Sequence, residues 1–189
     1  MSKIINILFR LFLTFNATSL ILVVYLIKQQ RSLNGYISYF AGLPNCVSYI
    51  IYFATPLGLT YLSLLLSRLL ISDSIEKEDD RPVIMEIEQA NNAYLPSYLG
   101  YFFVALSVPH CETLIFVFAV LFLFTFLSQT LYFNPLFLVF GYHFYYLTTH
   151  RSIKIFIITR RELKDPATVE FTRLKRINDF TFIDKEKGL

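Results

Sequence analysis

Three stretches of the chain are apolar and almost free of charge. They run from Leu11 to Ile27, from Ser32 to Ser67 and from Thr113 to Thr149, and the last contains the titratable His143. Because an α-helix rises about 1.5 Å per residue, about 20 apolar residues cross a hydrocarbon core about 30 Å thick. The pattern therefore predicts membrane-spanning helices.

Four spans are expected, at about residues 7–27, 46–71, 113–133 and 135–149. The first is expected to remain uncleaved, since no small-residue cleavage site follows it. Residues 97–111 stay open between an interfacial helix, a re-entrant piece and the first half of a broken third span. A full fifth span at this position is the alternative. Breakers at Pro109 and at Asn134-Pro135 limit these choices.

The distribution of basic residues predicts the orientation. Ten of the 17 Lys and Arg residues follow His150, and Lys3 and Arg10 lie near the N-terminus. Positive charge near span ends stays in the cytoplasm, so both termini are expected there. Two cytoplasmic termini require an even number of spans, which favours four over five. Lys28 and Arg31 would then face outward, against the same rule. The predicted location is the bacterial inner membrane.

The C-terminal residues 151–189 are expected to form a cytoplasmic tail. Residues 153–159 are rich in β-branched side chains and predict a strand, and residues 169–177 and 180–183 are further strand candidates. Three strands are near the minimum for stability, so this tail is expected to pack on another subunit or a partner. The predicted fold class is an all-α integral membrane helical bundle, residues 1–150, with a small β-like tail.

Composition supports a lipid environment. The chain is 55% hydrophobic and 16% charged, with 20 Phe, 13 Tyr and no Trp. Soluble domains average about 25% charged residues. Cys46 and Cys111 lie at or within apolar runs and are expected to be ordinary reduced side chains.

No known catalytic motif is visible. The sequence has no Gly-rich phosphate loop, no nucleophile elbow and no zinc-ligand spacing. The chain is therefore expected not to be an enzyme, and to hold no metal or cofactor.

Four polar residues in or near the predicted spans are candidate sensor groups. A carboxylate at mid-bilayer costs about 2.5–3.5 kcal/mol, so Glu112 would need a partner or a function there. Arg68 is a possible counter-charge. The alternative places Glu112 at a helix N-terminus, where the helix dipole favours a carboxylate. The candidates are His110, Glu112, Arg68 and His143.

Small and hydroxyl residues recur every three or four positions along the second predicted span. Such faces allow membrane helices to approach closely, so they indicate bundle packing or, alternatively, a homo-oligomer interface or the lining of a path. The residues are Ala54, Gly58, Thr60, Ser63 and Ser67.

Charged residues outside the spans are candidates for partner binding. Basic residues of the tail could attract anionic lipid or an acidic partner, and an acidic run precedes residue 81. Interspersed acids make a direct nucleic-acid footprint unexpected. These candidates are Arg160, Arg161, Arg173, Lys175, Arg176, Glu78, Asp79 and Asp80.

The chain resembles the KwaA family, the membrane subunit of the Kiwa anti-phage defence system. The resemblance is carried by the first span MSKIINILFRLFLTFNATSLILVVYLIKQQ, the Phe-rich TLIFVFAVLFLFTFL and the tail IKIFIITRRELKDPATVEFTRLKRINDFTFID. It implies a four-span inner-membrane homotetramer that senses phage attack at the envelope. It also implies a soluble DNA-binding effector, a KwaB-like protein, held at the cytoplasmic face.

The functional hypothesis is a non-enzymatic sensor and scaffold that detects envelope perturbation and recruits this effector. Two alternatives stay open. One is an immunity protein against a pore-forming toxin, and the other is a small ion channel or pore.

Overall fold

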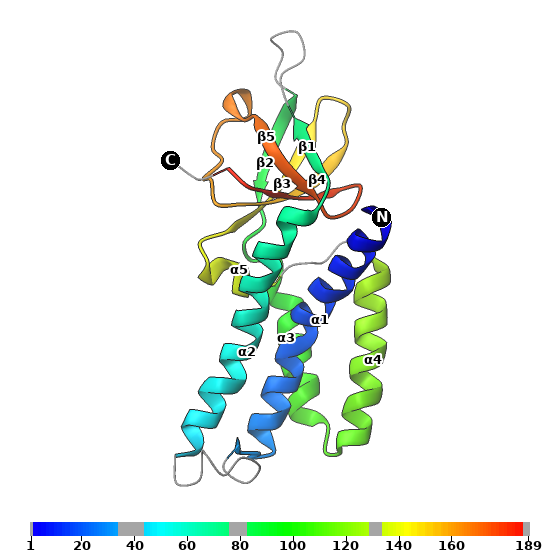
Figure 1. Cartoon of the computed structure of the whole chain (residues 1–189), viewed down its shortest axis with the longest axis vertical. Helices are drawn as coiled ribbons and strands as arrows, with labels where there is room; N and C mark the ends of the chain where they lie inside the picture. The colour runs from blue at the N-terminus through cyan, green and yellow to red at the C-terminus, as the bar shows by residue number, and fades with distance from the viewer. Residues whose placement is uncertain (1, 34–43, 76–82, 129–133, 187–189) are drawn as a thin grey trace. The chain divides into compact units, whose positions relative to one another are not determined.

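The computed structural model describes residues 2–33, 44–75, 83–128 and 134–186 (Figure 1). The chain divides into two compact units, each assembled from separate segments. The helical unit comprises Phe12–Leu62 and Tyr94–Asn134. The sheet unit comprises Met1–Leu11, Ser63–Ala93 and Pro135–Leu189.

Four helices run side by side in Figure 1: α1 (Ser2–Lys28), α2 (Asn45–Leu66), α3 (Leu95–Ser107) and α4 (Cys111–Ser128). Among the described residues, three helical stretches are long and apolar enough to cross a membrane: Ile4–Lys28, Asn45–Leu69 and Cys111–Ser128. At 13 residues, α3 is only about 20 Å long, shorter than a hydrocarbon core. Residues 97–111 therefore contribute a separate short helix and the connection that leads into α4.

Apolar packing joins α1, α3 and α4 in the helical unit. Ile21 and Ala105 are fully buried at its centre, and Tyr25, Val108 and Leu114 pack around them. The Tyr98 hydroxyl donates to the Ala17 carbonyl at 2.8 Å, which fixes α3 against α1. The small side chain of Ala105 allows this close approach.

The sheet unit contains a six-stranded mixed sheet in the order β1-β5-β6-β4-β3-β2. The β4–β6 pair is parallel and the other pairs are antiparallel. Three short helices, η3 (Ser67–Leu69), α5 (Leu136–Val139) and η4 (Pro166–Thr168), also belong to this unit. The strands are β1 (Ser72–Ile75), β2 (Ile84–Gln89), β3 (His143–Thr149), β4 (Lys154–Thr159), β5 (Phe171–Arg176) and β6 (Thr181–Asp184).

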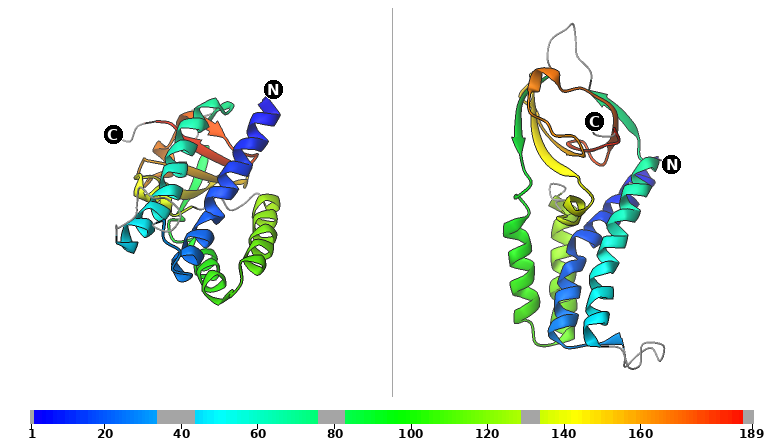
Figure 2. Two further views of the ribbon diagram at one scale, coloured as in Figure 1. Left: turned by 60° about the horizontal axis from the view of Figure 1, so that its bottom comes forward. Right: turned by 90° about the vertical axis from the view of Figure 1, so that its left-hand side faces the viewer.

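The sheet is strongly curved, as the right-hand view of Figure 2 shows. Ile75 on one edge strand and Ile84 on the other pack against a single apolar cluster. Fully buried Leu147, Ile157 and Phe171 form part of that cluster. The curvature therefore lets one face of the sheet enclose its own core, as in a partly closed barrel.

The prediction of an all-α bundle is wrong, because six strands form a sheet. Residues 135–149, expected as a fourth span, form α5 and β3 instead. The physical reason is burial of β3 on both faces. Leu147 faces the apolar cluster, while Phe144 stacks on Phe156 with ring centroids 5.8 Å apart. A strand buried on both faces reads as a continuous apolar run, much as a short span does.

The three strands predicted in the tail are present as β4, β5 and β6. They do not form a unit of their own, because β5 pairs with β1 and β4 pairs with β3. The polar part of the chain between α2 and α3 supplies the two edge strands β1 and β2. The additional strands that the tail needs thus come from the same chain.

Candidate functional site

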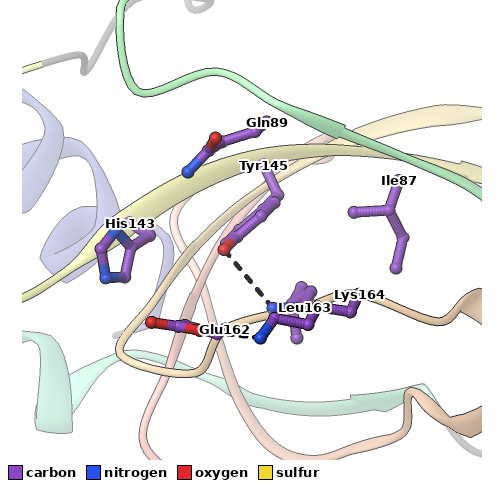
Figure 3. Close-up of a pocket in the computed structure, with 7 residues that line it drawn as sticks. All are labelled: Ile87, Gln89, His143, Tyr145, Glu162, Leu163 and Lys164. Atoms are coloured by element: carbon purple, nitrogen blue, oxygen red, sulfur yellow. Dashed lines mark hydrogen bonds and ion pairs between the residues drawn. The ribbon is translucent and has the colours of Figure 1, made fainter.

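A pocket of about 360 Å³ opens on the sheet unit beside the edge strand β2 (Figure 3). Strands β2 and β3 supply part of its lining, and the segment after β4 supplies the rest. Its lining contains both polar and apolar side chains, which suits recognition of a ligand by both shape and hydrogen bonds. The lining residues are Ile87, Gln89, His143, Tyr145, Glu162, Leu163 and Lys164.

Hydrogen bonds to neighbouring groups hold the pocket walls. Asn91 Oδ1 accepts from the Phe144 N–H at 2.7 Å, which directs Asn91 Nδ2 toward His143 Nδ1 at 3.1 Å. Nδ1 therefore acts as the acceptor and the proton of a neutral ring lies on Nε2. On the other wall, the Tyr145 hydroxyl accepts from the Leu163 N–H at 3.4 Å.

The charged pair in the pocket is open to solvent. Glu162 Oε2 lies 3.3 Å from Lys164 Nζ, and the two side chains are 70% and 83% exposed. An exposed pair of this kind contributes little stability, so both charges are accessible to a binding partner. His143, predicted as an intramembrane group, belongs to this pocket instead.

The neighbouring strand β2 is an edge of the sheet. The Ala90 N–H donates to the Phe144 carbonyl at 2.8 Å, toward β3. Because amide directions alternate along an antiparallel strand, the Gln89 N–H points away from β3. Together with the pocket, this edge offers main-chain hydrogen bonds and a side-chain recess at the same place.

The helical unit contains a buried polar cluster between α1, α2 and the segment after α4. Asn16, Thr60 and Asn134 are at most 2% exposed. The Asn16 amide oxygen accepts from Asn134 Nδ2 at 3.0 Å and from the Thr60 N–H at 3.3 Å. Asn16 Nδ2 donates to the Pro56 carbonyl at 3.2 Å. The amide thus ties three chain segments together inside the helical unit.

A second pocket, of about 470 Å³, lies in the helical unit. Lys28 Nζ donates to the Val108 carbonyl at 2.8 Å nearby, and Gln29 Nε2 donates to the Pro109 carbonyl at 3.1 Å. Glu112 is exposed in the first turn of α4, the position considered as the alternative to a mid-bilayer carboxylate. The pocket is lined by Tyr25, Leu26, Gln29, Arg31, Tyr52, Pro109, His110 and Cys111.

The structure divides the stripe predicted along the second span. Thr60, Ser63 and Ser67 are buried within the chain. Ala54 and Gly58 are exposed, and a Cβ atom built on Gly58 would meet nothing within 4 Å. Internal packing therefore uses the hydroxyl residues, and the small residues remain on an outer face of α2.

The predicted partner-binding residues are not equivalent. Arg161 pairs with Glu186 at 2.6 Å and Arg176 pairs with Asp73 at 2.7 Å, so both charges already have partners. Arg173 is exposed, as is Arg160. Lys175 and the sensor candidate Arg68 lie in the sheet unit close to Lys185. Their positive charges contribute to lowering the pKa of Lys185.

Glu78, Asp79 and Asp80 lie outside the described residues. Within the described ranges, no group of three or more His, Cys, Asp or Glu side chains is arranged to hold a metal ion.

Several site residues were not identified from sequence. The sequence shows Asn16 as a polar residue in an apolar run, but it marks its partner Asn134 only as a helix breaker. Tyr145, Glu162 and Leu163 carry no motif, because the pocket exists only after β3 and the segment after β4 come together. Lys185 was not singled out among the basic residues of the tail.

A family model described as "Anti-phage protein KwaA" matches residues 9–183, nearly the whole chain. A search of curated proteins and a search of solved structures each find no match.

Proposed function

The chain belongs to the KwaA family of anti-phage proteins, and from that premise we propose that it is a non-enzymatic sensor and scaffold in the bacterial inner membrane. In this proposal the apolar helices detect envelope perturbation. The sheet unit lies in the cytoplasm and recruits a soluble DNA-binding effector, a KwaB-like protein. Both chain termini are then cytoplasmic, which requires an even number of crossings and therefore makes the short α3 the fourth span beside the three longer helices.

The observation that carries the proposal is the connectivity of the sheet. Its unit is assembled from Met1–Leu11, Ser63–Ala93 and Pro135–Leu189. Along the chain, these segments precede, separate and follow the two segments of the helical unit. Strand β1 follows α2, β2 precedes α3, and β3 follows α4 and α5. A rearrangement of the helices would therefore act on the sheet through several covalent connections, as a transmembrane signal requires.

The buried amide cluster supports a sensing role for the helices. A stimulus can shift a conformational equilibrium only if it favours one of two states over the other. The Asn16 amide makes its bonds to Thr60, Asn134 and the Pro56 carbonyl in one particular packing of the helices. Bilayer deformation that separates these segments would break the bonds, so the cluster favours a defined resting arrangement.

The effector surface in this proposal is the edge strand β2 with its adjoining pocket. An extended peptide can add to a sheet edge through main-chain hydrogen bonds, and a neighbouring pocket supplies specificity. Ile87 and Gln89 belong to both the strand and the pocket, and exposed Glu162 and Lys164 border it. Glu86 and Glu88 also lie on β2 and give this edge acidic character.

The test is co-purification of the full chain with the effector in detergent. Deleting residues 152–189 is unsuitable, because it removes β4, β5 and β6 from the sheet. Gln89→Pro instead removes the outward N–H of β2 and is expected to abolish capture. Ser74→Pro is the matched control on the other edge, since the Ser74 N–H donates to Oδ1 of the preceding residue, Asp73, rather than across the sheet. Retained capture by a folded Gln89→Pro protein would refute this surface.

A homo-oligomer, a tetramer by family resemblance, is part of the same proposal. Of the described residues of α4, only Leu114 is buried within one chain, and Ala54 and Gly58 are exposed on α2. Small residues on an outer face allow helices of neighbouring copies to pack closely. Native mass spectrometry of the wild type and of Gly58→Leu tests this. A change of subunit number in Gly58→Leu supports the α2 contact, and an unchanged number rejects it.

A further inference from the structure

Four basic side chains of the sheet unit converge near the end of α2. Lys185, just after β6, donates from Nζ to the Leu64 carbonyl at 2.8 Å. Lys175 on β5 donates to the Leu70 carbonyl and to Ser72 Oγ, both at 2.9 Å. The Arg160 guanidinium, just after β4, lies 4.8 Å from the centre of the Tyr142 ring. Arg68 lies in η3, directly after α2.

Lys185 lies close enough to the other three cations for their charges to act on it. Burial, together with the positive charges of Arg68, Arg160 and Lys175, lowers the pKa of Lys185 to about 8. Asp184 is the acidic group that opposes this shift. Its carboxylate is buried and already accepts bonds from Thr159 Oγ1 at 2.7 Å and from the Glu186 N–H at 2.8 Å. The carboxylate that acts on Lys185 is therefore already engaged by other groups of the chain.

Other basic residues of the sheet unit have ion-pair partners. Arg161 pairs with Glu186, Arg176 with Asp73 and Lys154 with Glu88. In the part of the chain that the structure describes, neither Arg68 nor Arg160 nor Lys185 makes an ion pair with an acidic side chain. The carbonyls at the end of α2 account for Lys185 and Lys175, because a helix C-terminus favours cations. These carbonyls do not explain why the exposed Arg68 and Arg160 also lie here.

The position of the cluster indicates the kind of anion. Arg68 is the penultimate residue of the candidate span Asn45–Leu69. Leu69 and Ile71 beside it are 66% and 48% exposed, as apolar residues at a bilayer boundary would be. Lipid phosphates lie at this depth, and an arginine guanidinium can donate two parallel hydrogen bonds to one phosphate.

We propose that Arg68, Arg160, Lys175 and Lys185 form a binding site for a phosphate group at the membrane-proximal end of the sheet. The two arginines donate hydrogen bonds to the phosphate oxygens from the solvent side. The two lysines, which donate to the Leu64 and Leu70 carbonyls, place further positive charge behind the phosphate. The phosphate belongs either to an anionic lipid headgroup or to a soluble phosphate compound, and the two sources are separable by experiment.

The experiment uses the full chain purified in an uncharged detergent. Phosphatidylglycerol, phosphatidylcholine and inorganic phosphate are titrated separately while thermal unfolding is followed by circular dichroism. Bound lipid is counted in parallel by native mass spectrometry. The variant is Arg68→Gln/Arg160→Gln. The control is Lys154→Gln/Lys164→Gln, which removes the same charge from two exposed, ion-paired lysines.

Phosphatidylglycerol is expected to stabilise the wild type and the control, and the arginine variant should need about thirtyfold more of it, since each basic residue near an anionic surface contributes about 1 kcal/mol. Equal protection by inorganic phosphate, lost in the arginine variant, supports the same site with a soluble ligand. The proposal is overturned if the arginine variant responds like the wild type, or if phosphatidylcholine protects as well as phosphatidylglycerol. Effector capture is not a readout, so failure here leaves the proposed scaffold role untouched.

Discussion

Arg176 on β5 and Asp73 on β1 form an ion pair with Arg176 Nη2 2.7 Å from Asp73 Oδ2. A second bond runs from Arg176 Nε to the same oxygen at 2.9 Å, across a sequence separation of 103 residues. The Arg176 N–H donates to the Ile71 carbonyl at 3.0 Å as well. These contacts attach the segment that follows α2 to the C-terminal strands, so the acidic segment and the basic tail belong to one sheet.

The Asp73–Arg176 pair is expected to stabilise the sheet modestly. Its side chains are 29% and 43% exposed, so a double-mutant cycle with Asp73→Asn and Arg176→Gln should give a coupling free energy of about 0.5–1 kcal/mol. Urea unfolding of the full chain in detergent, followed by circular dichroism, measures it. Strictly additive single variants would show that the pair contributes nothing.

Sequence alone could predict those elements whose pattern depends on local structure. The β-branched run in Lys154–Thr159 gave a strand, and the long apolar runs of α1, α2 and α4 gave helices. The sequence could not distinguish a short membrane span from a strand that is buried on both faces. Phe144 and Leu147 are both fully buried although they lie on opposite faces of β3, so the usual alternation of period two is absent.

The candidate sites depended on pairings that a single sequence does not contain. The polar character of Asn16 was visible, but its bond to Asn134 requires two distant segments to meet. The basic residues of the tail looked alike, yet Arg161 and Arg176 are paired internally while Arg160 is exposed beside Tyr142. Charge counting identified the tail as basic, and only the fold shows which charges remain available.

Asn16→Ala should destabilise the helical unit. The substitution removes the buried amide that accepts from Asn134 Nδ2 and donates to the Pro56 carbonyl, at a cost of about 1–2 kcal/mol. Asn92→Ala, in the turn before α3 and exposed, is the control. Thermal unfolding in detergent checks the difference. If Asn16→Ala unfolds at the same temperature as Asn92→Ala, the cluster does not stabilise the helical unit.

Gly141 is expected to resist substitution because of its backbone conformation. Its φ angle is +73°, in the left-handed region that side chains with a Cβ atom rarely adopt, at the turn between α5 and β3. Gly141→Ala should cost about 1 kcal/mol even though a Cβ atom there would meet nothing within 4 Å. Gly100→Ala, inside α3 with equally open space, should instead stabilise by up to about 1 kcal/mol. Opposite shifts in the unfolding midpoint are the expected result, and equal shifts would contradict it.

The charge of Lys185 predicts how stability depends on pH. Its pKa in the folded chain is lowered from 10.5 to about 8, through burial first and then the charges of Arg68, Arg160 and Lys175. The unfolded chain therefore keeps this proton at pH values where the folded chain has released it. The free energy of unfolding should rise with pH between about 8 and 10.5 through this group, and should gain nothing from it below pH 8.

Lys185→Met tests this, since it removes the titrating group and keeps most of the side-chain volume. In phosphate-free detergent the variant should lose the part of the pH slope between 8 and 10.5 that the wild type shows. Lys154→Met is the matched control, because Lys154 is exposed and pairs with Glu88. Its pKa is raised, mainly by the hydrogen bond to Glu88, so it should not produce a slope of this sign. A wild-type slope that persists unchanged in Lys185→Met would show that another group titrates there, and that the four cations are less strongly coupled than their positions indicate.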